Sequence, residues 1–544
     1  MTASPLIDDG RNRWLDRLAW ALLALLAAIA ALTFRDYGLG WDDFTHAQYG
    51  DLLLSLYTSG FRDTRALSFV NLYLYGGGFD MAAALLAKIL PFDLFETRRL
   101  VGAAVGLIGL FATWRIARRS GGPLAGLLAL ALLATCPLYY GHMFINPKDG
   151  PFAAAMAVFL LGLVRLIDEH PKPSVATLAI LGAGFGLSIG SRIMAGFGVI
   201  DAALALVLLF AVEARAEGWP AARARFARLA LMLIPAAILA YAVMGLLWPW
   251  GVANPLNPVL AIETFSHFFE NPWRELFGGE LLQPTEMPRS YVPVLMGLQL
   301  PELFLLLGCA GVLGGLAAAC RSELTARSRA IHLGIALAAV LPVLVTVIAR
   351  PAMYNGIRHF VFVLPPLAVA GGLAGAWVAA SAARFGRAGP GLLVACFAAG
   401  IALPAVEMTR LHPYEYAFYN HLIGGVRGAQ SRYMLDYWGL AFKQAGNELR
   451  DMLSKRGETP PAGAKWTVAT CGPHPPARVA LGDRFEPTWE IKGADFALTL
   501  GTFYCEKLDA PVLVEIVRDG VIFARAYDLR GRTITNMFTV PPVK

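Results

Sequence analysis

Charged residues are scarce in this sequence. They make up 16% of its 544 residues and hydrophobic residues make up 57%, whereas a soluble domain has roughly 25% charged and 45–50% apolar residues. A soluble globular fold is therefore excluded for most of the chain. Apolar runs of about 20 residues, the length that crosses a bilayer as a helix, recur throughout residues 18–407. Residues 408–544 are polar and strand-like, so we expect a transmembrane body followed by a C-terminal domain in water.

The first apolar run, residues 18–33, lacks the small-residue cleavage site of a secretory signal. Because Arg11, Arg13 and Arg17 precede it, we expect it to remain as an anchor with residues 1–17 in the cytoplasm. Further spans bring the expected number to about eleven. Their approximate limits are 99–117, 123–142, 151–167, 174–190, 193–213, 229–248, 300–319, 330–349, 360–380 and 390–407.

Lysine and arginine are rare on one side of these spans and collect in alternate turns on the other. Short cytoplasmic loops carry the positive excess, so the side with the arginines is predicted to face the cytoplasm. The same alternation places residues 408–544 outside. This loop bias explains the net charge of +7, and no nucleic-acid partner is needed. The residues that define the cytoplasmic side are Arg115, Arg118, Arg119, Arg165, Lys172, Arg215, Arg223, Arg225, Arg228, Arg321, Arg327, Arg329, Arg384 and Arg387.

Residues 66–90 do not fit this alternation. The segment is apolar enough to span, but a crossing there would move Arg115, Arg118 and Arg119 to the outer side. We therefore expect short helices that lie against the outer leaflet, interrupted at residues 76–78, all glycine.

Cysteine is also rare, with six residues. Cys471 and Cys505 fall in the predicted outer domain, where a disulfide can persist, but pairing cannot be read from sequence and two free thiols remain an equal alternative. No spacing of histidine, cysteine and carboxylate residues meets a metal-site pattern, and His46 and His142 are expected to be structural. The remaining cysteines are expected to be small apolar fillers in or near spans: Cys136, Cys309, Cys320 and Cys396.

Ionisable residues gather in four places on the predicted outer side. Outer loops are usually depleted of arginine and lysine, so the cations retained there point to an anionic ligand. The four places are the pair Asp42 and Asp43 after the first span, Lys148 and Asp149 after the third, Arg192 in the turn after the fifth, and Arg358 and His359 before a late span.

Each of these places also has a purely structural explanation. Asp42 and Asp43 could be a solvated loop or a helix N-cap. Lys148 could reach to lipid headgroups. Arg192 could pair with a lipid phosphate or a helix C-terminus, and Arg358 and His359 could be an interfacial anchor. The meeting of all four places on one predicted face favours a binding site.

In order and sidedness these groups resemble the GT-C type of polytopic glycosyltransferases that use lipid-linked sugars, in particular the protein O-mannosyltransferase-like and aminoarabinose-transferase-like branch (glycosyltransferase family 39-like). The resemblance covers most of the membrane body. It rests on the motifs Trp41-Asp42-Asp43 in the first outer loop (34–98), Asn146-Pro147-Lys148-Asp149, Gly356-Ile357-Arg358-His359-Phe360 with Leu364-Pro365-Pro366, and Asp436-Tyr437-Trp438-Gly439, the last similar to bacterial members with an extra outer domain.

The resemblance implies an all-α GT-C membrane body over residues 18–407, in a bacterial inner membrane, with a small extracytoplasmic α/β domain over residues 408–544. It implies transfer of a sugar from a polyprenyl-phosphate donor to an acceptor on the outer, periplasmic face, the acceptor being a protein, lipid or polysaccharide. Metal dependence varies among such enzymes, so a divalent cation stays open and none is assigned.

Residue roles follow from the same resemblance. Asp42 and Asp43 are the catalytic candidates, with Asp42 as general base and its pKa raised by burial and by the neighbouring carboxylate. Asp43 either assists or orients. The substrate-binding candidates, whose cations would neutralise the leaving phosphate, are Lys148, Asp149, Arg192, Arg358 and His359.

A transporter or flippase of a lipid-linked or anionic substrate is the main alternative. Such a protein would place charges at mid-depth near broken helices, whereas the charges here cluster at one face. In the C-terminal domain, a helix over 437–455 and strands at 466–471, 496–500, 511–516 and 521–527 are predicted. Acceptor docking and a structural cap are equal expectations for this domain.

Overall fold

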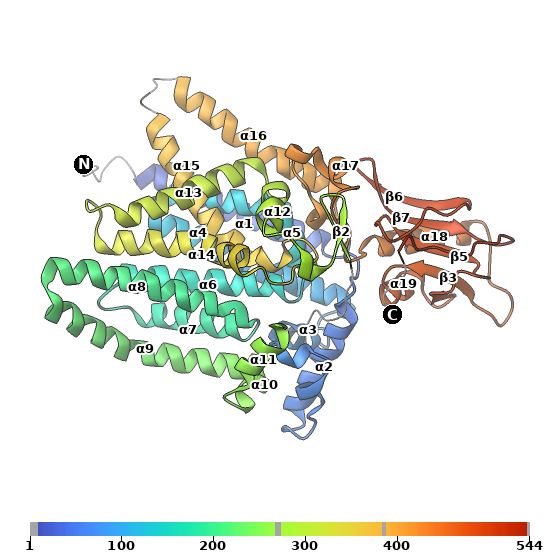
Figure 1. Ribbon diagram of the computed structural model, residues 1–544, viewed down its shortest axis with the longest axis horizontal. Helices are drawn as coiled ribbons and strands as arrows, with labels where there is room; N and C mark the ends of the chain where they lie inside the picture. Colours follow the sequence, from blue (N-terminus) through green and yellow to red (C-terminus); the bar gives the residue numbers. More distant parts are fainter. Residues whose placement is uncertain (1–8, 267–273, 383, 385–387, 541–544) are drawn as a thin grey trace.

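The computed structural model describes residues 9–266, 274–382, 384 and 388–540. Arg387 and residues 1–8 of the predicted cytoplasmic N-terminus lie outside the described residues. Figure 1 shows a bundle of long helices with a small sheet domain at one end.

Within the described residues, nine helices are long and apolar enough to cross a membrane. The chain is therefore a multi-pass membrane protein, as predicted. These helices are α1 (Asp9–Thr33), α4 (Leu94–Ala134), α6 (Asp149–Asp168), α8 (Gly196–Glu217), α9 (Trp219–Leu247), α13 (Glu302–Cys320), α14 (Ala326–Ala349), α15 (Leu364–Ala382) and α16 (Ala388–Leu411).

Helix α4 makes two passes. At Gly122 the backbone leaves the helical region (φ 84°, ψ 179°) before Pro123. A Cβ on Gly126 would lie 2.8 Å from Cβ of Arg118, so the second limb runs back along the first. After a break the return path continues as α5 (Pro137–Ile145). With the shorter α7 (Val175–Ile189), these limbs follow the predicted segments along the chain.

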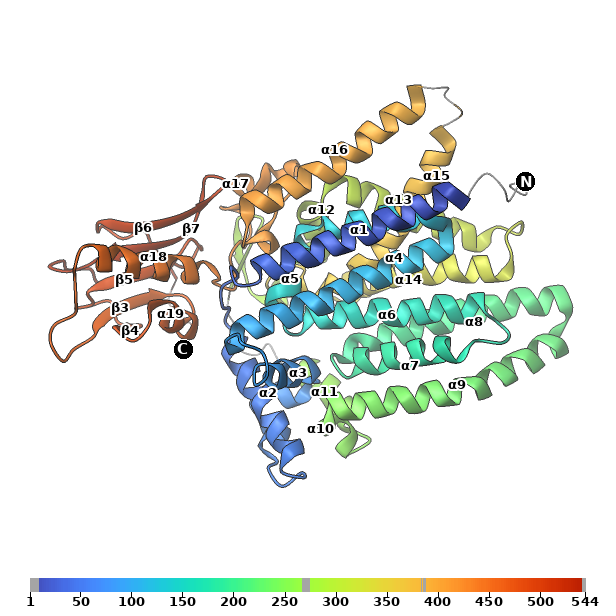
Figure 2. The ribbon, with the colours of Figure 1, turned by 180° about the vertical axis from the view of Figure 1, so that it is seen from behind.

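The first outer loop forms short helices, as predicted, at the end of the bundle that carries the sheet domain (Figure 2). Around the predicted break, the backbone is extended at Tyr75. A Cβ on Gly76 would lie 1.3 Å from the carbonyl oxygen of Gly190, so only glycine permits this contact with the end of α7. The elements are α2 (Asp43–Thr58), the 3₁₀ turns η1 (Arg65–Ser68) and η2 (Leu72–Leu74), and α3 (Gly78–Leu86).

The segment between α9 and α13 also lies at this end. It contains α10 (Pro249–Ala253), α11 (Asn257–Ser266), a hairpin of β1 (Glu275–Phe277) and β2 (Glu280–Leu282), η4 (Pro284–Glu286) and α12 (Tyr291–Gln299). The sequence predicted no elements here, because these runs are too short to show a clear period.

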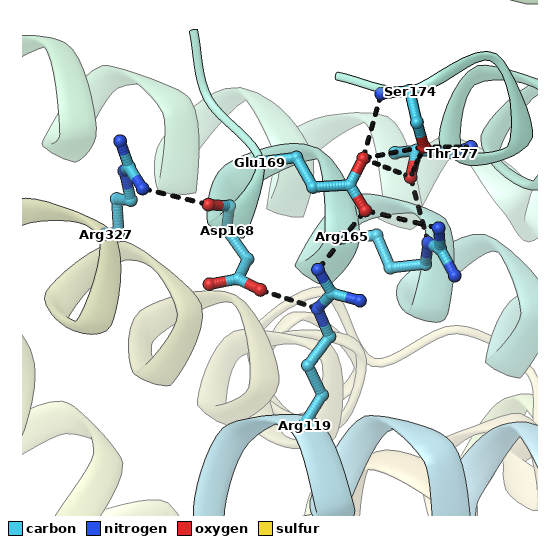
Figure 3. A network of polar contacts seen from close by, with 7 residues as sticks. All are labelled: Arg119, Arg165, Asp168, Glu169, Ser174, Thr177 and Arg327. Atoms are coloured by element: carbon cyan, nitrogen blue, oxygen red, sulfur yellow. Dashed lines mark hydrogen bonds and ion pairs between the residues drawn. The ribbon is translucent and has the colours of Figure 1, made fainter. Parts of the chain in front are cut away.

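Arginines from several predicted cytoplasmic turns meet at the opposite end of the bundle (Figure 3). Arg119 pairs with Asp168 at 2.6 Å and with Glu169 at 3.2 Å. Arg165 also pairs with Glu169, and Arg327 donates to the backbone carbonyl of Asp168. These turns therefore share one side, as predicted.

The C-terminal domain is a small mixed sheet with helices. Its strands run in the order β4-β3-β5-β7-β6, with β3 parallel to β4 and β5 and with β7 antiparallel to β5 and β6. Its elements are α18 (Ala441–Lys455), β3 (Trp466–Cys471), α19 (His474–Leu481), β4 (Phe485–Thr488), β5 (Phe496–Leu500), β6 (Val512–Arg518) and β7 (Val521–Asp528). Strand β4 was not predicted.

The helix predicted from residue 437 begins later, at Ala441. The reason is Asp436, whose carboxylate accepts hydrogen bonds from the backbone nitrogens of Gly439, Leu440 and Ala441 and so holds a tight loop before the helix. One hydrophobic cluster joins this loop to α1, α4 and the sheet, with Trp438 buried inside it. The domain and the membrane body therefore share a core.

The cysteines divide into two groups. Cys471 and Cys505 are joined by a disulfide, which decides the alternative that the sequence left open. Cys136 is buried, as expected for an apolar filler. Cys309, Cys320 and Cys396 are exposed on α13 and α16, so their prediction as fillers was wrong.

Candidate active site

Four segments bring their charged residues together at the end of the bundle that was predicted to face outward. Nζ of Lys148 and Nη1 of Arg358 each lie 3.8 Å from Oδ2 of Asp42. Nη2 of Arg192 lies 2.7 Å from Oδ1 of Asp149, the residue next to Lys148. These five residues, which the sequence predicted, form what we call the outer cluster.

The fold positions each member at the end of an element. Asp42 occupies the N-cap position of α2, and Lys148 occupies that of α6. Asp149 opens α6, where the positive end of the helix dipole favours a carboxylate. Arg192 lies three residues after the end of α7, at the N-cap of the 3₁₀ turn η3 (Ile193–Ala195), and Arg358 opens the 3₁₀ helix η5 (Arg358–Val363) that leads into α15.

Asp42 is the most open charged group of the outer cluster. Its side chain is 38% exposed, against 6% for Arg358 and 2% for Asp149. Burial raises the pKa of Asp42, but Lys148 and Arg358 outweigh burial and lower it overall. The raised pKa expected for Asp42 from the sequence was therefore wrong, because the two nearby cations outweigh burial and the carboxylate of Asp149.

Asp43 faces a different partner. Its two oxygens accept hydrogen bonds from Nη1 and Nη2 of Arg99, at 2.9 and 2.6 Å, and Oδ2 accepts another from the backbone nitrogen of Gly40 at 2.7 Å. Arg99 also donates to the carbonyl of Gly38. Both side chains are buried. Asp43 thus fastens the first outer loop to α4.

Asp149 is linked to the C-terminal segment through polar contacts. Nδ2 of Asn146 donates to Oδ2 of Asp149 at 2.8 Å and lies 3.3 Å from Nδ1 of His142. Nε2 of His142 lies 3.3 Å from the hydroxyl of Tyr437. The orientation of Asp149, and through it of Arg192, is therefore tied to a residue that follows the last span.

Aromatic rings support the three cations. The ring of Tyr75 lies 4.9 Å from Nζ of Lys148 and 5.6 Å from the guanidinium carbon of Arg192. The guanidinium carbon of Arg358 lies 4.9 Å from the ring of Tyr354 and 5.4 Å from that of Trp438. Such contacts stabilise a cation without neutralising its charge.

His359, the remaining predicted substrate-binding residue, lies beside the outer cluster. Its ring packs edge-on against Tyr354, with 5.0 Å between ring centroids. The structure does not pair it directly with a member of the cluster among the contacts described.

The outer cluster carries a surplus of positive charge, since three cations face two carboxylates, Asp42 and Asp149. Among the described residues, Nε of Arg192 and Nε of Arg358 are buried without a hydrogen-bond partner. Both observations suit an anion. No three histidine, cysteine or acidic side chains come together as a metal site in the part of the chain that the structure describes.

A small cavity of about 20 Å³, room for about one water molecule, lies among α6, α8, α14 and η5, and its lining is mostly apolar but includes Asp201. Phe362 of η5 lines it, one turn after Arg358 of the outer cluster. Met156, two turns along α6 from Asp149, lines it as well. The cavity therefore starts in the membrane-embedded part of the same two elements that end in the outer cluster.

Sequence reasoning missed several residues of this region. Arg99 was the first residue of a predicted span, where an ionisable residue at the membrane boundary was the available signal. Tyr75 and Tyr354 gave no signal, because a lone tyrosine is common at membrane surfaces. Trp438 stood in a quoted motif but had no assigned role.

Residues 79–248 match the family model described as dolichyl-phosphate-mannose-protein mannosyltransferase. This stretch includes Lys148, Asp149 and Arg192 of the outer cluster. No curated protein matches the sequence significantly.

Among solved structures, the chain is similar to ArnT from Cupriavidus metallidurans in the apo state, with 15% identity and a TM-score of 0.50 over 95% of this chain and 98% of that one. The structure of the same protein bound to undecaprenyl phosphate has 15% identity and a TM-score of 0.50 over 94% of this chain and 97% of that one. The apo oligosaccharyltransferase of Archaeoglobus fulgidus has 13% identity and a TM-score of 0.48 over 86% of this chain and 64% of that one. The chain thus has the fold of ArnT along nearly its whole length, and the predicted resemblance to the GT-C type is confirmed.

Proposed function

We propose that this chain is a membrane glycosyltransferase that moves a sugar from a polyprenyl-phosphate donor to an acceptor at the outer face of the membrane. The observation that carries the proposal is the outer cluster, an open carboxylate among three cations at one end of an apolar helix bundle. The solved complex of ArnT with undecaprenyl phosphate, a protein of the same fold, supports a lipid phosphate as the ligand.

Lys148, Arg192 and Arg358 are proposed to bind the donor phosphate. Lys148 and Arg358 stand 3.8 Å from Asp42, beyond a good hydrogen-bond distance, so both can turn to a phosphate oxygen. The buried Nε atoms of the two arginines offer further donors.

Asp42 is proposed to act as the general base. The acceptor hydroxyl or amine attacks the anomeric carbon, the bond from that carbon to the phosphate oxygen breaks, and its electron pair leaves on the phosphate. The proton of the acceptor passes to Asp42. A bound phosphate would offset the cations that lower the pKa of Asp42, so the carboxylate would become a better base when the donor is present.

The remaining predicted residues take supporting roles in this proposal. Asp43 orients the loop that carries Asp42, because Arg99 occupies both of its oxygens. Asp149 orients Arg192. His359 is adjacent to Arg358 in the sequence and is proposed to contact the sugar.

The site is proposed to face the periplasm of a bacterial cell, with the N-terminus in the cytoplasm and the C-terminal domain outside. The arginines gathered at the opposite end of the bundle support this orientation. The disulfide between Cys471 and Cys505 supports an oxidising compartment for the domain.

The test compares Asp42→Asn with Asp51→Asn, a matched control that removes an exposed carboxylate from the same helix. Radiolabelled undecaprenyl-phosphate sugars serve as donors and membranes of the expression host as the source of acceptor. Asp42→Asn should lower turnover about 10²- to 10⁴-fold, the usual contribution of a general base. Binding of undecaprenyl phosphate should be retained, and Asp51→Asn should behave like the wild type.

Two results would overturn the proposal. One is wild-type turnover in Asp42→Asn. The other is a wild-type protein that consumes no polyprenyl-phosphate sugar but moves such lipids across vesicle membranes, as a flippase would.

A further inference from the structure

A second buried polar group lies beside the outer cluster, within the first outer loop. Nδ1 of His46, on α2, lies 2.6 Å from Oδ2 of Asp80 on α3. Nη2 of Arg98, on α4, donates to the other oxygen of Asp80, also at 2.6 Å. The side chains are 3% exposed for His46 and Asp80 and 1% for Arg98. None of these three residues has a role in the proposed function.

The hydrogen bonds assign the proton on His46. Arg98 keeps Asp80 ionised, and an ionised carboxylate only accepts hydrogen bonds. Nδ1 of His46 must therefore carry the hydrogen, which leaves a lone pair on Nε2. Among the described residues, nothing hydrogen bonds to Nε2 of His46. The ring is thus held in one tautomer with its accepting nitrogen unused.

His46 is also the helical neighbour of Asp42. The backbone nitrogen of His46 donates to the carbonyl of Asp42 at 3.0 Å. Residues four apart lie on the same helix face, with about 5–6 Å between Cβ atoms. The outer cluster and the group around His46 are therefore adjacent turns of one face of α2.

The charged groups that act on His46 or on its partner Asp80 come from four elements: Asp80 of α3, Arg98 of α4, Lys148 before α6 and Asp42 at the start of α2. Burial lowers the pKa of His46, while Asp80 opposes burial and Lys148 adds to it. The imidazole is therefore neutral near pH 7 in the free protein. A phosphate bound at Lys148 would remove part of the repulsion and make the ring a better proton acceptor.

We propose that His46 is a positioning residue of the transferase that relays the proton: Nε2 takes from Asp42 the proton that Asp42 took from the acceptor. The proposal rests on the proposed function. After the bond to the phosphate has broken, the carboxylic acid of Asp42 gives its proton to Nε2 of His46. The resulting imidazolium is balanced by Asp80, and the proton is then lost to water while Asp42 returns to its ionised form. Atoms and charges balance without another reactant.

A purely structural role for the group would be a clamp that joins α2, α3 and α4. A clamp needs only the hydrogen bond from residue 46 to Asp80, which asparagine can make, whereas a relay needs a proton acceptor, which asparagine lacks. The amide nitrogen of His46→Asn stands where Nδ1 stood and keeps the hydrogen bond to Asp80, but asparagine cannot take up a proton. His46→Ala removes both the hydrogen bond and the proton acceptor, and it leaves room for an imidazole molecule.

The experiment measures turnover of undecaprenyl-phosphate sugar against pH, and binding of undecaprenyl phosphate, for the full-length protein. Wild-type turnover should fall at low pH as His46 becomes protonated. His46→Asn should lose about 10²-fold or more in turnover, within the range for a proton-transfer group, and should lose that acid limb, with binding changed less than about threefold. Added imidazole should restore turnover in His46→Ala, but not in His46→Asn.

His412→Ala is the matched control. His412 also pairs with carboxylates, Glu415 at 2.7 Å and Asp36 at 2.9 Å, and among the described residues it makes no hydrogen bond or ion pair with the outer cluster. Imidazole should not change its turnover.

Wild-type turnover and an unchanged acid limb in His46→Asn would overturn the relay and leave the proposed function standing. A loss in His46→Ala that imidazole does not restore, with His46→Asn fully active, would assign the group to a clamp. A wild-type protein that consumes no donor would instead overturn the proposed function.

Discussion

The two ends of the helix bundle both gather arginines and carboxylates, but they use them differently. At the arginine-rich end of Figure 3, Glu169 accepts hydrogen bonds from the nitrogen and hydroxyl of Ser174 and from the hydroxyl of Thr177, and it pairs with Arg119 and Arg165. Most of these charges find close partners within the protein.

In the outer cluster, two cations stand 3.8 Å from one carboxylate, and two buried guanidinium nitrogens have no partner among the described residues. Leaving buried polar groups without partners is costly unless a ligand completes them. Within the same described part of the chain, Arg98 and Arg99 also have buried nitrogens without a partner, so it is the long distance between the cations and Asp42 that distinguishes the outer cluster from a structural network. Each of the following predictions tests this difference.

The largest effect on stability is expected for Asp43→Asn, which removes one partner of the buried ion pair between Asp43 and Arg99. Removing one partner of a buried ion pair costs about 3–5 kcal/mol, because the other charge stays buried. Arg99 would be left in that state. The midpoint of thermal unfolding in detergent should fall strongly. A midpoint like that of the wild type, together with lost transfer, would instead make Asp43 a catalytic residue.

Arg358→Ala should separate activity from stability. Removing a preorganised donor to developing negative charge costs about 10²–10³ in turnover. Because the nearest carboxylate oxygen to Arg358, on Asp42, is 3.8 Å away, its loss should lower the unfolding midpoint less than Asp43→Asn does, although the ring contacts with Tyr354 and Trp438 are lost as well. Turnover of undecaprenyl-phosphate sugar and thermal unfolding are measured on the same preparation. A large fall in the midpoint would show that the outer cluster is structural too.

Glu169→Gln should show the opposite pattern. Hydrogen bonds from Ser174 and Thr177 and the charge of Arg165 overcome burial and lower the pKa of Glu169 to about 2. Its stabilisation, ~2 kcal/mol for hydrogen bonds to a charged group, is therefore present above its ordinary pKa and lost as the pH falls toward 2. The gap between the unfolding midpoints of wild type and variant should be full at pH 7 and narrower at pH 3, with turnover unchanged at pH 7.

The smallest effect is expected for Arg119→Ala. Its partners Asp168 and Glu169 are partly exposed, and such ion pairs contribute about 0.2–1 kcal/mol. Turnover should stay at the wild-type level. A tenfold loss of turnover would break the comparison, because it would give the arginine-rich end a role in the reaction.

The sequence predicted the features that depend on composition and order along the chain. Hydropathy predicted the spans. The alternation of arginines between loops predicted that Asp42, Lys148, Arg192 and Arg358 lie on the same side of the membrane. Long apolar runs and loop charges are local properties, so one sequence is enough to read them.

The contacts within the site could not be predicted in the same way. Nothing in the dipeptide of Asp42 and Asp43 tells which carboxylate turns to Lys148 and which to Arg99, because adjacent side chains point in different directions and the partners are distant in sequence. The group of His46, Asp80 and Arg98 likewise joins three helices. Its only signal was ionisable residues in or next to an apolar stretch.

Trp438 and Tyr437 follow the last span, yet they touch Arg358 and His142. During synthesis, Asp42 and Lys148 leave the ribosome long before these two aromatic residues. A partly synthesised chain in the membrane would therefore contain the outer cluster without the contacts that Tyr437 and Trp438 make. Under the proposed function, the donor would therefore meet a complete site only after the end of the chain has folded back onto the bundle.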